Sequence, residues 1–369
     1  MSKKIRVSIP TVRSILNELI EEKLVLITGI GDSSGGRKPV LYSLSGDAFF
    51  ILAVEMDQYK AKAVIIDSLN ELRSEVIEFE TNINDPEFIP KLDQAFQNLL
   101  KASGIEQASV GAIGICMPGL IDPQNGINQT IKDQERQPVA ELVSKHFNVK
   151  TYIENDARMQ TQGEFVFGKA RNTKNTMVVN WSWGLGLGMI FNGDIYQGSN
   201  GCSGEFSHIR MVENGELCEC GKRGCLQTIA GAKHLLDIAK QEIGKGTISQ
   251  LTNEFTEQTD KLTIADIINC AQKGDELAIN LINTISKNVA WGLSILIQLY
   301  NPELILLNGP LTIPKQYILI TIQQALQQYC LENILSNVRI EISESAANSG
   351  LRGTAVMVFN KLFSSEVSN

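Results

Sequence analysis

The sequence predicts two α/β lobes preceded by a small basic segment. Three observations predict this arrangement. The chain has 369 residues, about twice the length of a typical domain. After residue 48, short β-rich runs are followed twice by helices and further strands, a succession typical of mixed sheets covered by helices. The first 46 residues, called the head below, differ from the remainder in charge and pattern.

The charge of the head is opposite to that of the body. The formal net charge is −8, yet the head carries seven basic and four acidic side chains, and the other 323 residues carry 26 basic and 37 acidic ones. A locally positive segment can contact a polyanion, while an acidic body cannot. From charge alone, a solvated terminal segment fits equally well.

The pattern inside the head favours DNA binding. Ser8 is expected to cap a helix that has Pro10 in its first turn and apolar residues at helical spacing. Apolar runs at 24–28 and 40–44, around the stretch GIGDSSGGRKP, predict a two-stranded ribbon. Helix and ribbon together are the layout of a winged helix-turn-helix. The side chains expected to contact DNA are Ser8, Thr11, Arg13, Ser14, Arg37 and Lys38.

This winged helix is expected to be incomplete. A full one has a first helix and part of a second before the recognition helix, and only seven residues precede Ser8. The head is therefore either a DNA-binding segment whose supporting elements lie elsewhere or a remnant of one.

The body is expected to contain a first lobe at residues 47–165 and a second at 166–369. In the first lobe, an antiparallel meander is predicted to precede alternating helices and strands, with elements at 49–56, 61–67, 74–80, about 86–102, 110–116, about 138–146 and 149–153. The second begins near residue 176, with helices at about 276–300 and about 315–329 around a strand at 303–307. We expect the last helix to pack back on the first lobe and a ligand to bind between the lobes.

Composition excludes several classes of protein. No apolar run approaches the roughly 18 residues that span a bilayer, and the N-terminus MSKKIRVSIP has no apolar core of a signal peptide. Seven cysteines in 369 residues are too sparse for a disulfide scaffold. We therefore expect a cytoplasmic protein without membrane contact.

The most specific chemical signal is the string HIRMVENGELCECGKRGC. It contains His208, Cys218, Cys220 and Cys225, the donor types that zinc prefers, and four such ligands close a tetrahedral shell. Glycines on both sides let the thiolates converge. Buried free cysteines are the alternative, but the C-x-C-x4-C spacing favours a structural Zn²⁺ site.

Two polar groups are candidates for binding a ligand. Asn155 and Asp156 follow a strand and begin a helix, so Asp156 is either a general base or hydroxyl acceptor, or an ordinary helix cap. Glu205 precedes His208 by three residues and is either a ligand contact or a solvated loop residue. The glycines of WGLGLGMIFNG and LNGP permit phosphate contact or tight strand turns, but they form no complete P-loop or dinucleotide motif.

Taken together, these strings resemble the ROK family (repressors, open reading frames and sugar kinases). The resemblance is strongest to its transcriptional-repressor branch, which includes xylose and N-acetylglucosamine repressors and adds an N-terminal winged helix. It rests on SIPTVRSIL and GGRKP in the head, and on MPGLID, ENDAR, GEFSH, CECGKRGC and NPELILLNGPL in the body. It implies a two-lobed actin-like ATPase fold, also described as ribonuclease-H-like.

The resemblance also implies roles for individual residues. In sugar kinases of the family, the aspartate of the END motif deprotonates a sugar hydroxyl and its neighbouring asparagine binds the sugar, which corresponds to Asp156 and Asn155. The carboxylate and histidine of GE..H contact the sugar, which corresponds to Glu205 and His208. A further carboxylate two residues after the last zinc cysteine is replaced here by Gln227.

The segments that correspond to the phosphate loops depart from the kinase pattern. A D-x-G-G-T type loop reads Glu55-Met56-Asp57-Gln58-Tyr59, without either glycine and with a carboxylate where phosphate charge would sit. The second loop reads Ser182-Trp183-Gly184 after Trp181, and the two indoles are expected to add bulk there. Losing both loops removes the positioning that phosphoryl transfer needs.

Three functional hypotheses follow. The leading one is a sugar-responsive transcriptional regulator, a homodimer or homotetramer that binds operator DNA and, between its lobes, a sugar or sugar phosphate. The alternative is an ATP-dependent hexose or N-acetylhexosamine kinase with Asp156 as base. The third is a ligand-binding body with a nonfunctional head.

Overall fold

The structure is a computed structural model that describes residues 7–32, 38–131, 138–344 and 348–364. The chain divides into two compact units. Unit 1 comprises residues 1–117, 123–154 and 354–369, and unit 2 comprises residues 118–122 and 155–353. Within the described ranges, no helix is long and apolar enough to cross a membrane.

The head holds a helix and an antiparallel pair of strands. These elements are α2 (Ile9–Glu21), β1 (Val25–Ile30) and β2 (Val40–Leu44). The side chain of Ser8 accepts a hydrogen bond from the N–H of Thr11 and caps α2, as predicted. No side chain of α2 is fully buried, and Leu16 and Leu19 are half-buried. Arg37, predicted to contact DNA, lies outside the described residues.

Unit 1 is built on a mixed five-stranded sheet with the order β5-β4-β3-β6-β9. Its first three strands form an antiparallel meander, and β3 runs parallel to β6. Its elements are β3 (Phe50–Met56), β4 (Lys60–Asp67), β5 (Ile77–Glu80), α3 (Phe88–Ser103), β6 (Val110–Met117), β8 (Ile127–Asn128), α4 (Val139–Phe147) and β9 (Lys150–Asn155).

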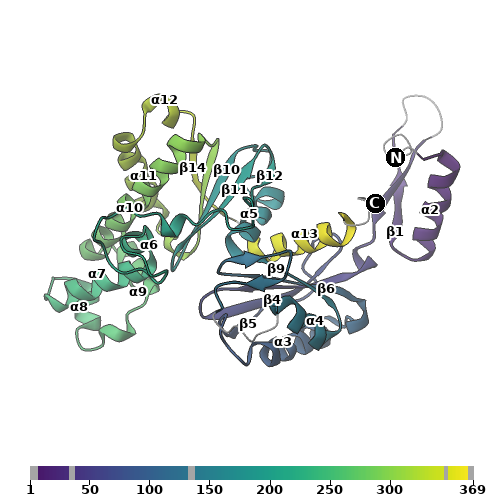
Figure 1. Cartoon of the computed structure of the whole chain (residues 1–369), viewed down its shortest axis with the longest axis horizontal. Helices are drawn as coiled ribbons and strands as arrows, with labels where there is room; N and C mark the ends of the chain where they lie inside the picture. The colour runs from purple at the N-terminus through teal and green to yellow at the C-terminus, as the bar shows by residue number, and fades with distance from the viewer. Residues whose placement is uncertain (1–6, 33–37, 132–137, 345–347, 365–369) are drawn as a thin grey trace. The chain divides into compact units, whose positions relative to one another are not determined.

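Helices cover both faces of this sheet (Figure 1). The helices α3 and α4 lie on one face, and the part of α13 (Ser349–Ser364) that belongs to unit 1 lies on the other. The helix α13 approaches β6 closely at Gly114, where an added Cβ would lie 2.5 Å from Val358 and 2.6 Å from Thr354. The strands β3 and β4 are almost fully buried because both faces are covered.

Unit 2 repeats the sheet order of unit 1, as β12-β11-β10-β13-β14. Again three antiparallel strands are followed by two parallel ones. Its elements are β7 (Ile121–Asp122), α5 (Asp156–Phe167), β10 (Thr176–Trp181), β11 (Leu185–Phe191), β12 (Asp194–Ile195), α6 (Gln227–Ala230), α7 (Ala232–Gly244), α8 (Gln250–Phe255), α9 (Ile264–Gln272), α10 (Glu276–Tyr300), β13 (Leu304–Asn308), α11 (Lys315–Tyr329), α12 (Glu332–Leu335) and β14 (Arg339–Ile342). The predicted mixed α/β fold is thereby confirmed, and α10 and α11 have the predicted bounds.

The two faces of β11 pack against different helices of unit 2. Its residues Leu185, Leu187 and Met189 join the main core with α10 and α11. The intervening glycines face α5, and this explains why they are glycines. An added Cβ would lie 1.9 Å from Thr161 Oγ1 at Gly188, and 2.9 Å from the Ala157 Cβ at Gly186. The Gly-rich string therefore serves close helix-to-strand packing at these two positions.

Replacing Gly188 by alanine is expected to lower the free energy of unfolding by roughly 1–3 kcal/mol. The new methyl group would also meet the carbonyl oxygen of Ala157 at 2.9 Å, so rotating Thr161 cannot relieve the overlap alone. Urea or thermal unfolding measures the loss. Gly244→Ala is the matched control, because nothing lies within 4 Å of a Cβ there. Equal destabilisation by both substitutions would contradict the packing argument.

Candidate functional site

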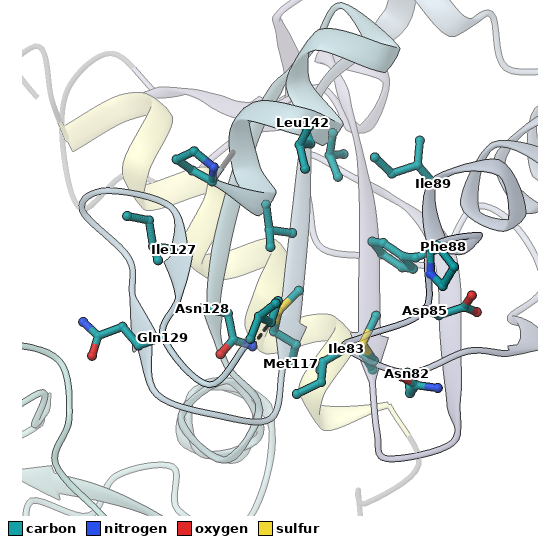
Figure 2. A pocket seen from close by; sticks show the side chains of 16 residues that line it. Asn82, Ile83, Asp85, Phe88, Ile89, Met117, Ile127, Asn128, Gln129 and Leu142 are labelled. Carbon is teal, nitrogen blue, oxygen red and sulfur yellow. Dashed lines mark hydrogen bonds between the residues drawn. The ribbon is translucent and has the colours of Figure 1, made fainter. Parts of the chain in front are cut away.

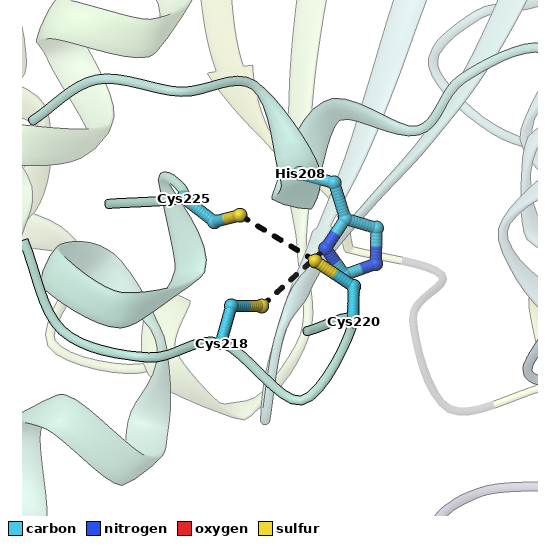
Figure 3. A group of neighbouring side chains, drawn as sticks. All are labelled: His208, Cys218, Cys220 and Cys225. Atoms are coloured by element: carbon cyan, nitrogen blue, oxygen red, sulfur yellow. Dashed lines mark hydrogen bonds between the residues drawn. The ribbon is translucent and has the colours of Figure 1, made fainter. Parts of the chain in front are cut away.

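The structure brings together the four predicted metal ligands of unit 2. The ligand atoms of His208, Cys218, Cys220 and Cys225 all lie within 4.8 Å of one another. The Sγ of Cys218 is 3.6 Å from the Nδ1 of His208, and the Sγ atoms of Cys220 and Cys225 are 3.6 Å apart. The four side chains point toward one another (Figure 3). One nitrogen and three sulfurs are a donor set that could hold a metal ion.

Glycines shape the loop that carries the three cysteines. Gly221 and Gly224 have positive φ angles of 83° and 73°. An added Cβ at Gly224 would lie 1.7 Å from the carbonyl oxygen of Val212, so a larger residue has no room there. The N–H of Cys218 donates to the carbonyl of Lys222 (2.7 Å), which closes the turn between the first and last thiols. The sequence therefore preorganises the cluster through its backbone.

Burial favours the uncharged forms of most groups in the cluster. Burial raises the pKa of the Cys225 thiol to about 12 and also raises the pKa of Cys218. Burial acts in the same sense on Cys220, but the N–H of Lys222 donates to its sulfur and the pKa is lowered on balance. Burial lowers the pKa of His208, which favours the neutral imidazole that binds metals. The thiols of Cys218 and Cys225 must therefore lose their protons when a metal binds.

Asn155 and Asp156 stand at the start of α5. Asn155 caps the helix, because its Oδ1 accepts a hydrogen bond from the N–H of Arg158 (3.2 Å). Its Nδ2 donates to the carbonyl of Gly119 (3.2 Å), which fixes the side chain from two directions. Asp156 is the first residue of the helix and is half-buried. Asn155, and not Asp156, is the helix cap, so the cap interpretation of Asp156 is wrong.

Glu205 lies beside both the metal cluster and Asp156. Its carboxylate is 3.9 Å from Nε2 of His208, the ring nitrogen that does not face the cysteines. Burial raises the pKa of Glu205, while the charges of Arg158 and Asp156 act on it in opposite directions. A cluster of two carboxylates and an imidazole offers several acceptors and one donor for the hydroxyl groups of a ligand.

Gln227, the last predicted ligand contact, begins α6. An added Cβ at Gly184 would lie 3.2 Å from Gln227 Oε1 and 3.0 Å from Ser207 Oγ. Gln227, two residues after the candidate metal ligand Cys225, therefore packs against the turn at Gly184. Its amide supplies both a donor and an acceptor at this turn.

Arg158 is a residue of this site that the sequence analysis missed. Its side chain is only 2% exposed, and its Nη1 donates to the carbonyl of Gly201, in the loop that leads to Glu205. It thereby ties the first turn of α5 to that loop. A cation in the first turn of a helix is unfavourable by the helix dipole. An arginine in the first helical turn of ENDAR is therefore the sequence signal that could have identified Arg158 as a residue of this site.

The turn after β3 binds its own carboxylate. The Oδ1 of Asp57 accepts hydrogen bonds from the N–H groups of Tyr59 (2.7 Å) and Lys60 (2.8 Å). Tyr59 is the last residue of the segment that corresponds to the first phosphate loop of the resembled kinases, and Lys60 follows it. An internal anion therefore occupies two backbone donors of this turn.

The two indoles near the second loop have different positions. Trp181 is fully buried in the core of unit 2, and its Nε1–H donates to the carbonyl of Ala230 (2.7 Å). The expectation that it adds bulk to the loop is therefore wrong, because strand alternation points it into the core. Trp183 is half-buried and lines a small polar pocket together with Gln227 and His234.

The described residues predicted to contact DNA are all exposed on the surface of the head. Thr11, Arg13, Ser14 and Lys38 are exposed. Ser8 is also exposed, but its hydroxyl is used for capping and lies 2.8 Å from that of Thr11. Among the described residues predicted to contact DNA, Arg13 and Lys38 are the positively charged ones.

We expect the purified protein to carry about one metal ion per chain, measured by inductively coupled plasma mass spectrometry. Cys225→Ser should lose the ion and lower the melting temperature, because a closed shell of four ligands loses one. Affinity should fall as the pH falls, since the thiols of Cys218 and Cys225 must lose protons to bind. Cys202→Ser, outside the cluster, is the control. A metal-free wild type would contradict the expectation.

Comparisons with known proteins connect this site to a family. Residues 51–361 match the ROK family. The xylose repressor of Caldicellulosiruptor bescii is 25% identical over 371 residues, covering 99% of this chain and 92% of the relative.

Two solved structures have a similar fold. A ROK family transcriptional regulator, described as a homolog of the Escherichia coli MLC protein, matches with a TM-score of 0.79 and 22% identity, over 99% of this chain and 93% of that chain. A ROK family glucokinase from Streptomyces griseus, solved with glucose and AMPPNP, matches with a TM-score of 0.74 and 22% identity, over 84% and 98%. The fold is thus the two-lobed actin-like ATPase fold. Because the family match spans more than half of its length, the chain belongs to the ROK family.

Proposed function

We propose that the chain is a sugar-responsive transcriptional regulator, most simply a repressor. The observation that carries the proposal is a contrast between two parts of the chain. The residues that correspond to sugar contacts, Asp156, Glu205 and His208, lie together, whereas the turn after β3 is closed by Asp57. Relatives that cover almost the whole chain, including the head, are named repressors or regulators. A protein that keeps its sugar contacts but lacks a phosphate-binding loop is expected to sense a sugar and not to phosphorylate it.

The effector is a sugar or a sugar phosphate. The carboxylates of Asp156 and Glu205 accept hydrogen bonds from hydroxyl groups, and the Nε2 of His208 faces away from the thiols and can donate one. Asn155 and Gln227 complete the set of contacts that we assign to the effector. Asn155 holds the first turn of α5 in place through its bond to Gly119.

The metal of the cluster is zinc with a structural role. Three thiolates and one imidazole leave no open position in a tetrahedral shell, so the ion binds no substrate. His208 would bind it through Nδ1, which lies beside Cys218, and Nε2 would remain on the side of Glu205. The ion would connect the cysteine loop with the effector contacts.

The head is the operator-binding segment. Arg13 and Lys38 supply positive charge for phosphates, and Thr11 and Ser14 are short polar side chains suited to base edges. A homodimer or homotetramer would present paired heads to a palindromic operator. The effector acts by binding one conformation of the chain better than another.

A kinase that phosphorylates a hexose or an N-acetylhexosamine is the second candidate. One observation favours it, namely that Asp156 is half-buried at the start of α5, where the family's catalytic base stands. The structural likeness to a glucokinase is compatible with it. The closed turn at Asp57 argues against it, and we propose that the chain has no sugar kinase activity.

An effector should release the chain from DNA. The measurement is gel retardation on a duplex selected by the chain from a random library, with D-xylose, D-glucose, N-acetyl-D-glucosamine or their phosphates added. Asp156→Asn should raise the effector Kd roughly 10- to 100-fold, since hydrogen bonds to charged groups contribute about 1.5–3 kcal/mol. Asp194→Asn, exposed on β12, should leave it unchanged.

Substitutions in the head test DNA binding in the same gel retardation assay. Arg13→Ala with Lys38→Ala should weaken DNA binding and reduce its salt dependence, while Lys101→Ala on α3 should not. A wild-type chain that selects no duplex would overturn the regulator, whatever sugar it binds.

Magnesium ATP should neither raise the melting temperature nor support ADP release with any sugar of that panel. The reason is that Asp57 already occupies the N–H groups of Tyr59 and Lys60. A ligand that binds only the folded state would raise the melting temperature. Turnover that Asp156→Asn abolishes would establish the kinase instead.

A further inference from the structure

The helix α13 belongs to both units. It is continuous from Ser349 to Ser364, and the boundary between the units falls between Gly353 and Thr354. Its first turn therefore packs within unit 2, to which the effector contacts are assigned, and its later turns pack within unit 1, which includes the head. A helix is stiff along its axis, because each turn is hydrogen-bonded to the next. The contacts at its two ends decide what such a helix connects.

In unit 2, the start of α13 packs directly on α5. An added Cβ at Gly163 of α5 would lie 2.0 Å from the carbonyl oxygen of Ser349. An added Cβ at Gly353 of α13 would lie 1.8 Å from the carbonyl oxygen of Met159. Because neither glycine carries a side chain, the backbones of the two helices are in direct contact.

The helix α5 is also packed against β11, on the side that carries Ala157 and Thr161. At its far end, the ring of Phe167 lies 5.3 Å from the guanidinium of Arg352 on α13. Protein interiors are close-packed, so a helix in contact on two sides cannot shift without moving one of its neighbours. A ligand that displaces Asp156 at the start of α5 would therefore displace α13 as well.

In unit 1, α13 packs on the sheet as closely as it does on α5. An added Cβ at Gly114 of β6 would lie 2.5 Å from a methyl carbon of Val358. Among the described residues, the opposite face of the sheet has a cavity of about 550 Å³, lined by residues of α3, α4 and the ends of β3 and β6 (Figure 2). The face that α13 covers has no room for even one methyl group at Gly114. A shift of α13 is therefore passed to the residues that it contacts in unit 1.

The later turns of α13 contact the chain just after the head. The ring centroid of Phe49 lies 5.7 Å from that of Phe359 and 5.4 Å from that of Phe363, and the last two are 4.8 Å apart. These separations are typical of interacting aromatic pairs. Phe49 stands between β2, the last strand of the head, and β3, the first strand of the unit 1 sheet. We call these three residues the aromatic cluster.

Residues 45–49, which join the head to β3, are fixed by hydrogen bonds. The hydroxyl of Ser68, just after β4, donates to the carbonyl of Gly46 (3.0 Å). The N–H of Ser45 donates to the carbonyl of Leu24, just before β1 (2.8 Å), and Ser45 is buried. A flexible linker would isolate the head from a shift at Phe49, whereas a fixed one passes the shift on.

We propose that α13 couples the effector contacts to the head. Binding at the start of α5 displaces α13, and the aromatic cluster passes this displacement to residues 45–49 and so to the DNA-binding segment. The inference rests on the proposed function, because it needs an effector that changes DNA binding. It goes further by naming the residues that carry the regulation, none of which is assigned to the sugar or to DNA. Two sites are coupled in this way when sugar and DNA favour different positions of one element.

The test measures how strongly a sugar weakens DNA binding. The full chain is titrated onto its selected duplex by gel retardation, without sugar and with saturating D-xylose, D-glucose, N-acetyl-D-glucosamine or their phosphates. The ratio of the two Kd values is the coupling factor, expected to be about 5–150 for the wild type with the sugar that releases it. Phe359→Ala should lower this factor by about threefold or more. A variant that is only less stable loses affinity with and without sugar, and its coupling factor does not change.

Two further variants make the test specific. Tyr300→Ala is the matched control, because it removes a half-exposed ring that lies 5.6 Å from Phe191 in unit 2, away from α13, and it should keep the wild-type factor. Phe363→Ala should lower the factor as Phe359→Ala does. Since Phe363 is 52% exposed, this variant carries the test if the melting temperature shows that Phe359→Ala does not fold.

The outcomes separate this inference from the function on which it rests. Coupling factors unchanged in the folded variants of Phe359 and Phe363, or lowered equally in the Tyr300 control, would overturn the role of α13 and leave the regulator intact. A wild-type chain that no sugar of the panel releases from DNA would overturn the proposed function and this inference with it. Adding Phe49→Ala to Phe359→Ala should cause no further loss, because both rings act through one contact.

Discussion

The close packing of two segments on β11 is the constraint on which the proposed effector site depends. On one side, α5 approaches the strand because Gly186 and Gly188 carry no side chain. The loop before His208 approaches it at Gly204, where an added Cβ would lie 2.2 Å from the carbonyl oxygen of Leu187. One strand therefore sets the positions of the residues that begin α5 and of those that follow Gly204. Without these two approaches, Asp156 and Glu205 would not share one electrostatic environment.

The candidate metal cluster and Arg158 lie on two sides of Glu205. The cluster holds His208 by Nδ1, so the orientation of the ring follows from the cysteine loop. Arg158 ties α5 to the loop at Gly201. Glu205 stands between them, 3.9 Å from the imidazole and within the field of the guanidinium. Glu205 is thus placed by the charges and the loop around it, while the groups on either side of it are fixed by hydrogen bonds and close packing.

The sequence predicted features that depend on neighbours along the chain. The cap at Ser8, the bounds of α10 and α11 and the cysteine spacing are all local patterns, and the structure has them. It did not predict features that depend on distant segments. The partner of Arg158 lies 43 residues away, and the cavity in unit 1 is lined by strands and helices between residues 56 and 143. The sequence analysis also missed α7, although its buried residues Leu235, Ala239 and Ile243 recur at helical spacing.

The position of Trp181 was misjudged for a related reason. Its place beside the second loop is a fact of sequence, but the direction of its side chain depends on the register of β10 against β13. In that register Met177, Val179 and Trp181 face the helical core, and Val178 faces the other side. The argument against nucleotide binding therefore rests on Asp57 and not on the indole. That carboxylate accepts hydrogen bonds from two consecutive backbone N–H groups of the turn, the kind of donors that bind anions.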